Sequence, residues 1–229
     1  MVNDDERAYD ELRTGFTAAV SHELRTPLAR ILALLDSADL PGADVHGLIA
    51  QARVEVEDAG VLIDEILFLS ELESGREVVA LGHTAALPVL RAVSAGLDDA
   101  AARAGVDLAA DGDAEVEVPL RPRMLRIVAE NLAENAIRYA GHGARFTFNV
   151  SRAGDFVVMT SADDGVGVPP AAVERLFERF YRADAARTTR GTGLGLAIVK
   201  HIVVAAGGDM DADGGPGRGL RIRARFPAS

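Results

Sequence analysis

The chain of 229 residues is 48% hydrophobic and 26% charged, which excludes a globally disordered protein and allows one large domain or two small ones. It contains no cysteine, so disulfide bonds and thiolate metal sites are excluded. The formal net charge of −11 argues against nucleic acid as a partner, because binding a phosphate backbone requires a basic surface.

No stretch of the sequence is apolar for long enough to cross a bilayer. The most apolar stretches, residues 61–69 and 194–206, are short or interrupted by charged residues. The acidic N-terminal segment lacks the basic and then apolar layout of a signal peptide. We therefore expect a chain that makes no membrane contact of its own and lies in the cytoplasm, alone or as the cytoplasmic part of a longer membrane-bound protein.

The first third of the chain has the apolar spacing of two amphipathic helices. Within residues 5–37, apolar side chains such as Leu24, Leu28 and Leu35 recur at helical spacing. Residues 37–47 contain one proline and two glycines and predict a turn, after which a second apolar stripe runs to about residue 74. The helices are predicted to form an antiparallel hairpin. Since one hairpin cannot bury both stripes, we expect a homodimer with a four-helix bundle.

From residue 76 onward, short runs with strand character mix with helical stretches. Strands are predicted at residues 78–81, 106–108, 115–118, 146–150, 156–160 and 220–226. Helices are predicted at residues 85–103, 122–139, 170–177 and 194–206. Because strands and helices do not alternate strictly, this order predicts an α/β sandwich with a mixed sheet rather than a doubly wound parallel sheet.

A polar cluster surrounds His22 in the first predicted helix. Pro27 removes one helical hydrogen bond and crowds the carbonyl of Glu23, so we expect the helix to bend within a turn of His22. Glu23 is able to hydrogen-bond one ring nitrogen of His22, which leaves the other as a nucleophile. Thr26 lies one turn further on the same face. A solvent-exposed histidine is the alternative, but a proline inside a helix is unfavourable by about 3 kcal/mol and so indicates a function.

Two asparagines share one face of the helix predicted at residues 122–139. Asn131 and Asn135 are four residues apart. Amide oxygens suit a hard cation such as Mg²⁺, which proteins usually hold together with phosphates. Taken alone, the pair favours solvated or capping asparagines.

An acidic, glycine-rich turn follows the strand predicted at residues 156–160. The carboxylate of Asp163 is able to accept a hydrogen bond from an exocyclic amine, and Gly165 and Gly167 allow a flat ring to approach the backbone. An ordinary acidic turn is the alternative.

A second glycine-rich segment opens the last predicted helix. It consists of Gly191, Thr192, Gly193, Leu194, Gly195 and Leu196. Glycines before a helix expose backbone N–H groups where the helix dipole favours anions, which predicts a phosphate cradle. The segment is not a dinucleotide-binding fingerprint, because no βαβ unit with a downstream acidic residue surrounds it, and it lacks the lysine of a P-loop. A flexible turn is the alternative.

In their order and spacing these segments resemble the motifs of the sensor histidine kinases. The matches are residues 21–28 to the H box of HisKA-type kinases, 130–139 to the N box, 163–169 to the G1 box, 176–182 to the F box, 183–190 to the ATP lid and 191–196 to the G2 box. The resemblance covers the chain from about residue 6 to residue 226. It implies a GHKL-type ATP-binding domain of the Bergerat fold behind the helical hairpin.

The resemblance implies a dimerisation and phosphotransfer hairpin in residues 1–76 and a catalytic ATP-binding domain in residues 77–229. ATP would phosphorylate His22 with Glu23 as base. The phosphoryl group would then pass to an aspartate of a response-regulator receiver domain. Thr26 would position water when the same protein dephosphorylates that regulator.

The resemblance also implies a set of nucleotide contacts. Asn135 would bind Mg²⁺, Asp163 would read adenine, and Arg138 would face the phosphates of ATP. The other residues of the set are Asn131, Tyr139, Gly165, Gly167, Arg182, Gly191, Thr192, Gly193, Leu194, Gly195 and Leu196.

An ATP-hydrolysing relative of the gyrase, Hsp90 or MutL type is the first alternative. Those proteins place a general-base glutamate one helical turn before the asparagine that binds Mg²⁺, and here that position is Asn131. Glu130 points about 100° away around the helix. Without a carboxylate to activate water, transfer to a side chain is favoured over hydrolysis.

A scaffold without kinase activity is the second alternative. Such a protein would be expected to have lost His22, Asn135 or Asp163, and all three are present. Dominant phosphatase activity is compatible with Thr26, and the sequence does not rank it against kinase activity.

Overall fold

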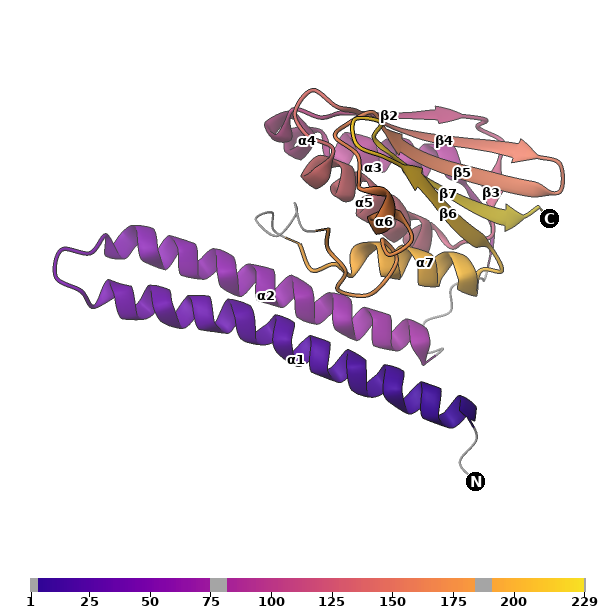
Figure 1. Ribbon diagram of the computed structural model, residues 1–229. Coiled ribbons are helices and arrows are strands. Elements are labelled where there is room, and N and C mark those ends of the chain that lie inside the picture. The colour runs from indigo at the N-terminus through magenta and orange to yellow at the C-terminus, as the bar shows by residue number, and fades with distance from the viewer. Residues whose placement is uncertain (1–3, 75–81, 184–190, 229) are drawn as a thin grey trace. The chain divides into compact units, whose positions relative to one another are not determined.

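The computed structural model describes the backbone of residues 4–74, 82–183 and 191–228, with side chains from residue 17 onward (Figure 1). The chain divides into two compact units, Met1–Ser70 and Glu71–Ser229. The predicted domain boundary after residue 76, the predicted strand at 78–81 and the predicted lid beyond residue 183 lie outside the described residues. In the described part of the chain, no helix is both long and apolar enough to span a membrane.

The N-terminal unit is a hairpin of two long helices, α1 (Asp4–Ala38) and α2 (Val45–Glu73), as predicted. The turn is shorter than expected because Asp44 caps α2: its carboxylate accepts a hydrogen bond from the Gly47 N–H at 3.1 Å. Across the hairpin, Arg30 Nη1 lies 3.5 Å from Glu55 Oε2.

An apolar strip on α1 stays exposed in the single chain. Leu28, Leu32 and Leu35 are 57%, 61% and 49% exposed. On α2, Ile63 and Leu67 are 44% and 57% exposed. The hairpin therefore buries only part of its apolar surface, and contiguous exposed apolar side chains of this kind mark an interaction surface.

The C-terminal unit is built on a mixed five-stranded sheet. Its strands are β2 (Asp107–Gly112), β4 (Arg145–Ala153), β5 (Phe156–Asp163), β6 (Asp209–Gly214) and β7 (Leu220–Pro227). The order across the sheet is β2-β4-β5-β7-β6, in which β2 and β4 are parallel and the other pairs are antiparallel. A separate antiparallel pair joins β1 (Thr84–Ala85) to β3 (Glu117–Val118). The predicted α/β sandwich with a mixed sheet is confirmed.

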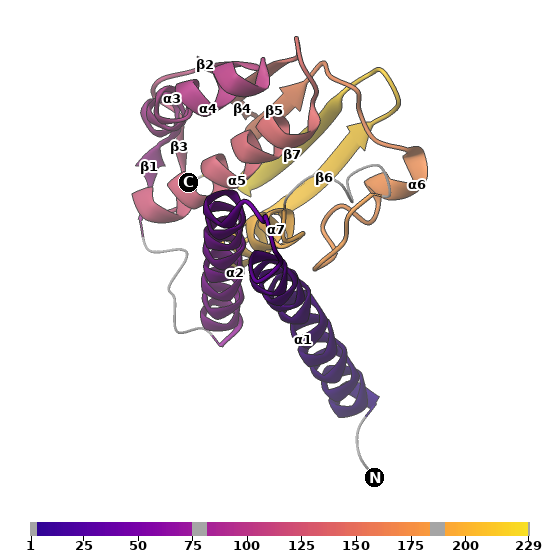
Figure 2. The ribbon, with the colours of Figure 1, turned by 90° about the vertical axis from the view of Figure 1, so that its left-hand side faces the viewer.

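Helices cover one face of this sheet. They are α3 (Ala86–Gly96), α4 (Asp98–Ala104), α5 (Pro122–Tyr139), α6 (Pro170–Val173) and α7 (Gly195–Ala205). The helix α5 packs between α3 and α7 (Figure 2). The core lies between these helices and the sheet, where Phe148 and Phe226 are fully buried and the rings of Phe146 and Phe148 meet edge to face at 4.7 Å.

Two predicted helices differ from the observed ones. The helix predicted at residues 85–103 breaks at Leu97, after Gly96 and before Asp98 and Asp99, whose negative charges favour the start of a new helix. The helix predicted at residues 170–177 ends at Val173 and continues as turns.

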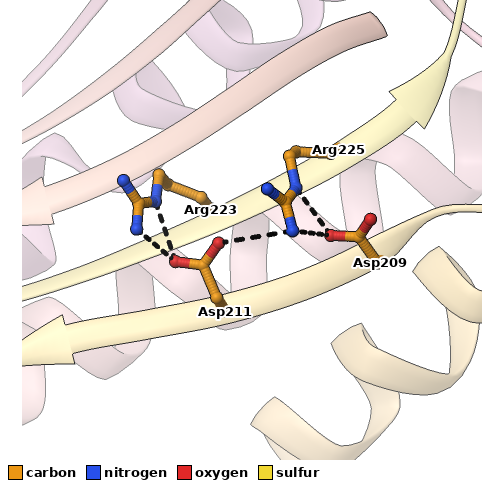
Figure 3. Close-up of polar contacts among 4 residues, drawn as sticks. All are labelled: Asp209, Asp211, Arg223 and Arg225. Atoms are coloured by element: carbon orange, nitrogen blue, oxygen red, sulfur yellow. Dashed lines mark hydrogen bonds and ion pairs between the residues drawn. The ribbon is translucent and has the colours of Figure 1, made fainter.

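The strand β6 was not predicted, because its alternate aspartates have no strand character by themselves. They face arginines of β7 across the ladder, Asp209 opposite Arg225 and Asp211 opposite Arg223. Each arginine lies 2.7 Å from the carboxylate opposite, and Arg225 also lies 3.9 Å from Asp211 (Figure 3). The hydrogen bond from Arg225 to Asp209 raises the pKa of that arginine. Charge pairs with β7, rather than residues of high β propensity, thus stabilise β6 at this edge of the sheet.

Candidate functional site

His22 lies on α1 with 76% of its side chain exposed. Its Nδ1 is 3.4 Å from Glu23 Oε1, the pairing that the sequence predicted. Thr26 shares this part of the helix and donates its hydroxyl hydrogen to the His22 carbonyl at 3.2 Å. The helix continues through Pro27. The bend that Pro27 predicts near His22 stays a prediction.

On α5, Asn131 is engaged with the protein itself. Its Nδ2 donates to the Ile127 carbonyl at 2.8 Å. Its Oδ1 lies against Gly195, where an added Cβ would be 2.5 Å from the oxygen. The absence of a side chain at Gly195 therefore lets α7 begin directly beside α5. The predicted contact of Asn131 with a nucleotide stays a prediction.

Asn135 lies one turn further along α5 and is half-buried. Among the residues that the structure describes, its amide makes no hydrogen bond, which leaves an amide oxygen for a cation. The same residues contain no group of three or more His, Asp or Glu side chains that could hold a metal. A single amide oxygen suits Mg²⁺, which takes most of its ligands from phosphates and water.

The end of α5 lies beside the start of the second glycine-rich segment. An added Cβ at Gly191 would lie 2.6 Å from the Tyr139 hydroxyl and 3.6 Å from Arg138 Nη1. Arg138 Nη2 donates to Glu134 Oε2 at 2.9 Å, in an exposed pair. Arg138 and Tyr139 thus reach the segment that the sequence predicted as a phosphate cradle.

Asp163 ends β5 and holds the start of β7. Its Oδ1 accepts hydrogen bonds from the backbone N–H groups of Gly165 at 3.0 Å and of Leu220 at 3.3 Å. Burial raises the pKa of Asp163 above its ordinary value of 3.8 and outweighs these two hydrogen bonds, while the charge of Asp164 adds to the rise. A half-buried acceptor of this kind suits an amine donor on a ligand.

Two glycine-rich loops interlock around Asp163. The Gly217 N–H donates to the Val166 carbonyl at 2.8 Å, and the Gly219 N–H donates to the Gly165 carbonyl at 3.1 Å. A Cβ at Gly219 would overlap the Asp163 carbonyl, and one at Gly165 would overlap the carbonyl of Ala140, the residue that follows α5. Gly167 is left-handed, with φ +70°, and lies equally close to the second loop. Glycine is needed for this close approach of backbone to backbone, which the sequence did not predict. The predicted approach of a flat ring to Gly165 and Gly167 stays a prediction.

The segment before α7 presents backbone rather than side chains. Leu194 and Leu196 are 0% and 8% exposed, so their side chains belong to the core. Thr192 Oγ1 accepts the Leu194 N–H at 3.2 Å. The first helical hydrogen bond of α7 runs from the Ile198 N–H to the Leu194 carbonyl at 2.9 Å, so the N–H groups of Gly195, Leu196 and Ala197 are left to meet an anion.

The sequence did not predict two features beside this segment. Phe180, within the F box match, has a left-handed backbone with φ +60°, which nothing in the sequence signals. Arg175 lies with its guanidinium 4.2 Å from the centre of the Tyr181 ring, and its hydrogen bond to Glu178 raises its pKa. Arg182, predicted to contact the nucleotide, is half-buried nearby.

Two family models match the chain. The model of the His Kinase A (phospho-acceptor) domain matches residues 12–75. The model of the histidine kinase-, DNA gyrase B-, and HSP90-like ATPase matches residues 121–229. The first range contains His22, and the second contains Asn135 and Asp163.

Individual proteins are similar along nearly the whole chain. The sensor-like histidine kinase SenX3 of Mycobacterium tuberculosis is 31% identical over 98% of this chain and 56% of SenX3. The sensor histidine kinase WalK of Bacillus subtilis is 32% identical over 97% of this chain and 38% of WalK. The chain thus spans about half the length, or less, of these curated relatives.

A solved structure of full-length ShkA in complex with AMPPNP covers 93% of this chain and 46% of ShkA, with a TM-score of 0.67 and 26% identity. Histidine kinase ThkA has been solved in complex with the response regulator protein TrrA. The structural match covers 99% of this chain and 66% of the ThkA chain, with a TM-score of 0.75 and 21% identity. The likeness to ThkA shows a shared fold.

Alanine at Gly219 should destabilise the C-terminal unit more than alanine at Gly217. Both glycines are left-handed, with φ +68° and +67°, but an added Cβ meets the Asp163 carbonyl only at Gly219. Gly217→Ala should lower the free energy of unfolding by about 1 kcal/mol, the penalty of a left-handed alanine. Gly219→Ala should lose a further ~1–3 kcal/mol through overlap. Urea titrations of both variants measure these free energies of unfolding, and equal losses in the two variants would contradict the interlocked loops.

The variant Asp163→Asn should be more stable than the wild type at pH 7. A carboxyl whose pKa is raised on folding favours the folded state below its ordinary pKa of 3.8, and this stabilisation is lost as pH rises through the raised value. Asparagine keeps the Oδ1 acceptor and does not ionise. The stability gained by the variant, measured by thermal unfolding, should therefore grow between pH 4 and pH 7. A gain that is constant or shrinks would contradict the assigned shift.

Proposed function

Since this chain belongs to the sensor histidine kinases, with a His Kinase A phospho-acceptor domain and an ATPase-like domain of the same family, we propose that it is their catalytic core. It transfers the γ-phosphoryl group of ATP to His22 and from there to an aspartate of a response-regulator receiver domain. The proposal is carried by the presence of two features in one chain. One unit holds the exposed His22 paired with Glu23, and the other holds Asn135, whose amide has no hydrogen-bond partner among the described residues, on the helix that contacts the second glycine-rich segment.

ATP binds in the C-terminal unit with its adenine amine on Asp163. Its triphosphate faces the start of α7, within reach of Arg138 and Tyr139. Asn135 holds Mg²⁺, which neutralises charge on the phosphates during transfer. The complex of ShkA with AMPPNP, an ATP analogue, supports this choice of ligand, because ShkA is 26% identical over most of this chain.

The phosphoryl step uses His22 as nucleophile. With the imidazole proton on Nδ1, the ring donates to Glu23 and keeps its other lone pair on Nε2. Nε2 attacks the γ-phosphorus, a P–N bond forms as the bond to the bridging oxygen breaks, and ADP leaves. Glu23 stabilises the positive charge that develops on the ring and is placed to accept the Nδ1 proton.

Two copies of the hairpin form a four-helix bundle. The exposed apolar strip at Leu28, Leu32 and Leu35 supports a homodimer, because a second hairpin would bury it. We assign residues 1–76 to this dimerisation and phosphotransfer domain and residues 77–229 to catalysis.

The partner is a receiver domain that presents an aspartate to phosphorylated His22. The complex of ThkA with the response regulator TrrA is an example of such a partnership on the same fold. Thr26, which lies one turn after His22, supports an additional phosphatase activity toward that regulator.

Incubation with ATP labelled at its γ-phosphate should label the wild type but not His22→Gln. The matched control is His46→Gln, which removes another exposed histidine of the same hairpin and should keep the label. Because His22 is not part of the nucleotide site, His22→Gln should also bind ATP as tightly as the wild type. Label that survives in His22→Gln would refute the proposal.

A further inference from the structure

Phe180 has a backbone conformation that bulky residues rarely adopt. Its φ is +60°, and among the described residues it is the only one other than glycine with a positive φ. Left-handed backbone at a bulky residue persists only where the surroundings enforce it, and such residues concentrate at functional sites. Phe180 lies at the border of the nucleotide site proposed above.

A direct contact with the glycine-rich segment enforces this conformation. The Phe180 N–H donates to the Gly193 carbonyl at 3.0 Å. Gly193 is itself left-handed, with φ +74°, and an added Cβ there would lie 2.8 Å from the Phe180 carbonyl carbon and 3.1 Å from the Tyr181 carbonyl oxygen. We call this pairing of Phe180 and Gly193 the clasp.

Side-chain contacts also hold the turn that carries Phe180. Arg175 hydrogen-bonds both carboxylate oxygens of Glu178 at 2.9–3.2 Å and lies over the Tyr181 ring. Lys200 of α7 lies 5.7 Å from the centre of the Phe177 ring. The turn is therefore attached to α7 at Lys200 and to the segment before α7 at Gly193, which fixes the clasp relative to that helix.

Gly193 lies two residues before the N–H groups that face the phosphates. The Leu194 N–H is already bonded to Thr192, so the free donors of the first turn begin at Gly195. Displacement of Gly193 would move these donors away from the triphosphate. The adenine side, at Asp163, is held by other contacts, with Gly165 and Leu220.

We propose that Phe180 is a positioning residue for the phosphates of the nucleotide: its left-handed backbone holds Gly193 and thereby aims the N–H groups at the start of α7. This inference rests on the proposed ATP site and assigns triphosphate binding and adenosine binding to different contacts. The clasp governs affinity for the triphosphate and leaves the recognition of adenosine unchanged.

The test compares dissociation constants for Mg²⁺–ATP and for adenosine, measured by titration of the full chain. Phe180→Val should lower ATP affinity about tenfold relative to adenosine, because a β-branched residue resists positive φ and the loss of one or two donors to a charged ligand has about this effect. Gly193→Ala should do the same through overlap. Phe180→Gly, which adopts positive φ readily, should keep the wild-type ratio.

Gly207→Ala is the matched control. Gly207 follows the other end of α7 with φ +76°, and an added Cβ there meets nothing within 4 Å. This variant should lose stability and keep the ratio of ATP to adenosine affinity. An unchanged ratio in Phe180→Val and Gly193→Ala would overturn the clasp, as would an equal change in Phe180→Gly and Phe180→Val. If the wild type bound neither ligand, the proposed function itself would fail.

Discussion

Two backbone N–H groups, from Gly165 and Leu220, donate to the same oxygen of Asp163, and this shared acceptor joins the end of β5 to the start of β7. Both glycine-rich loops close around it, so the part of the site proposed for adenine forms only if the last strand of the sheet is in place. Burial raises the pKa of Asp163, which means that the fold tolerates an ionised group it disfavours. A group kept under such a penalty is typical of a binding site.

The part of the site proposed for the phosphates depends on a different set of contacts. Gly195 lets α7 begin against Asn131 of α5, and Gly193 pairs with Phe180. Between the two sides, α5 places Asn135 with an amide oxygen available to a cation. The contacts proposed for adenine, metal and phosphates thus come from three elements that the sheet and its helices hold separately. A substitution on the phosphate side is therefore expected to leave the binding of adenine intact.

The sequence correctly predicted the elements whose formation depends on nearby residues. The bounds of α5 agree with the prediction because Pro122 marks its first turn and its apolar spacing is regular, and the mixed sheet followed from strands without βαβ alternation. The features that depend on residues far away in the sequence were not predicted. The aspartates of β6 form a strand only opposite the arginines of β7, and the conformation of Phe180 exists only against Gly193. Similarly, only the structure shows that the side chain of Leu194 is buried in the core.

The proposed nucleotide site depends on recognition of the exocyclic amine of adenine by Asp163. Inosine triphosphate tests it most directly, since it has the ribose and phosphates of ATP but carries a carbonyl oxygen where adenine has the amine. A carboxylate cannot accept a hydrogen bond from that oxygen and repels it. Calorimetric titration of the full chain should therefore show ATP binding at least about tenfold more tightly than inosine triphosphate. Equal affinities for the two nucleotides would contradict the account.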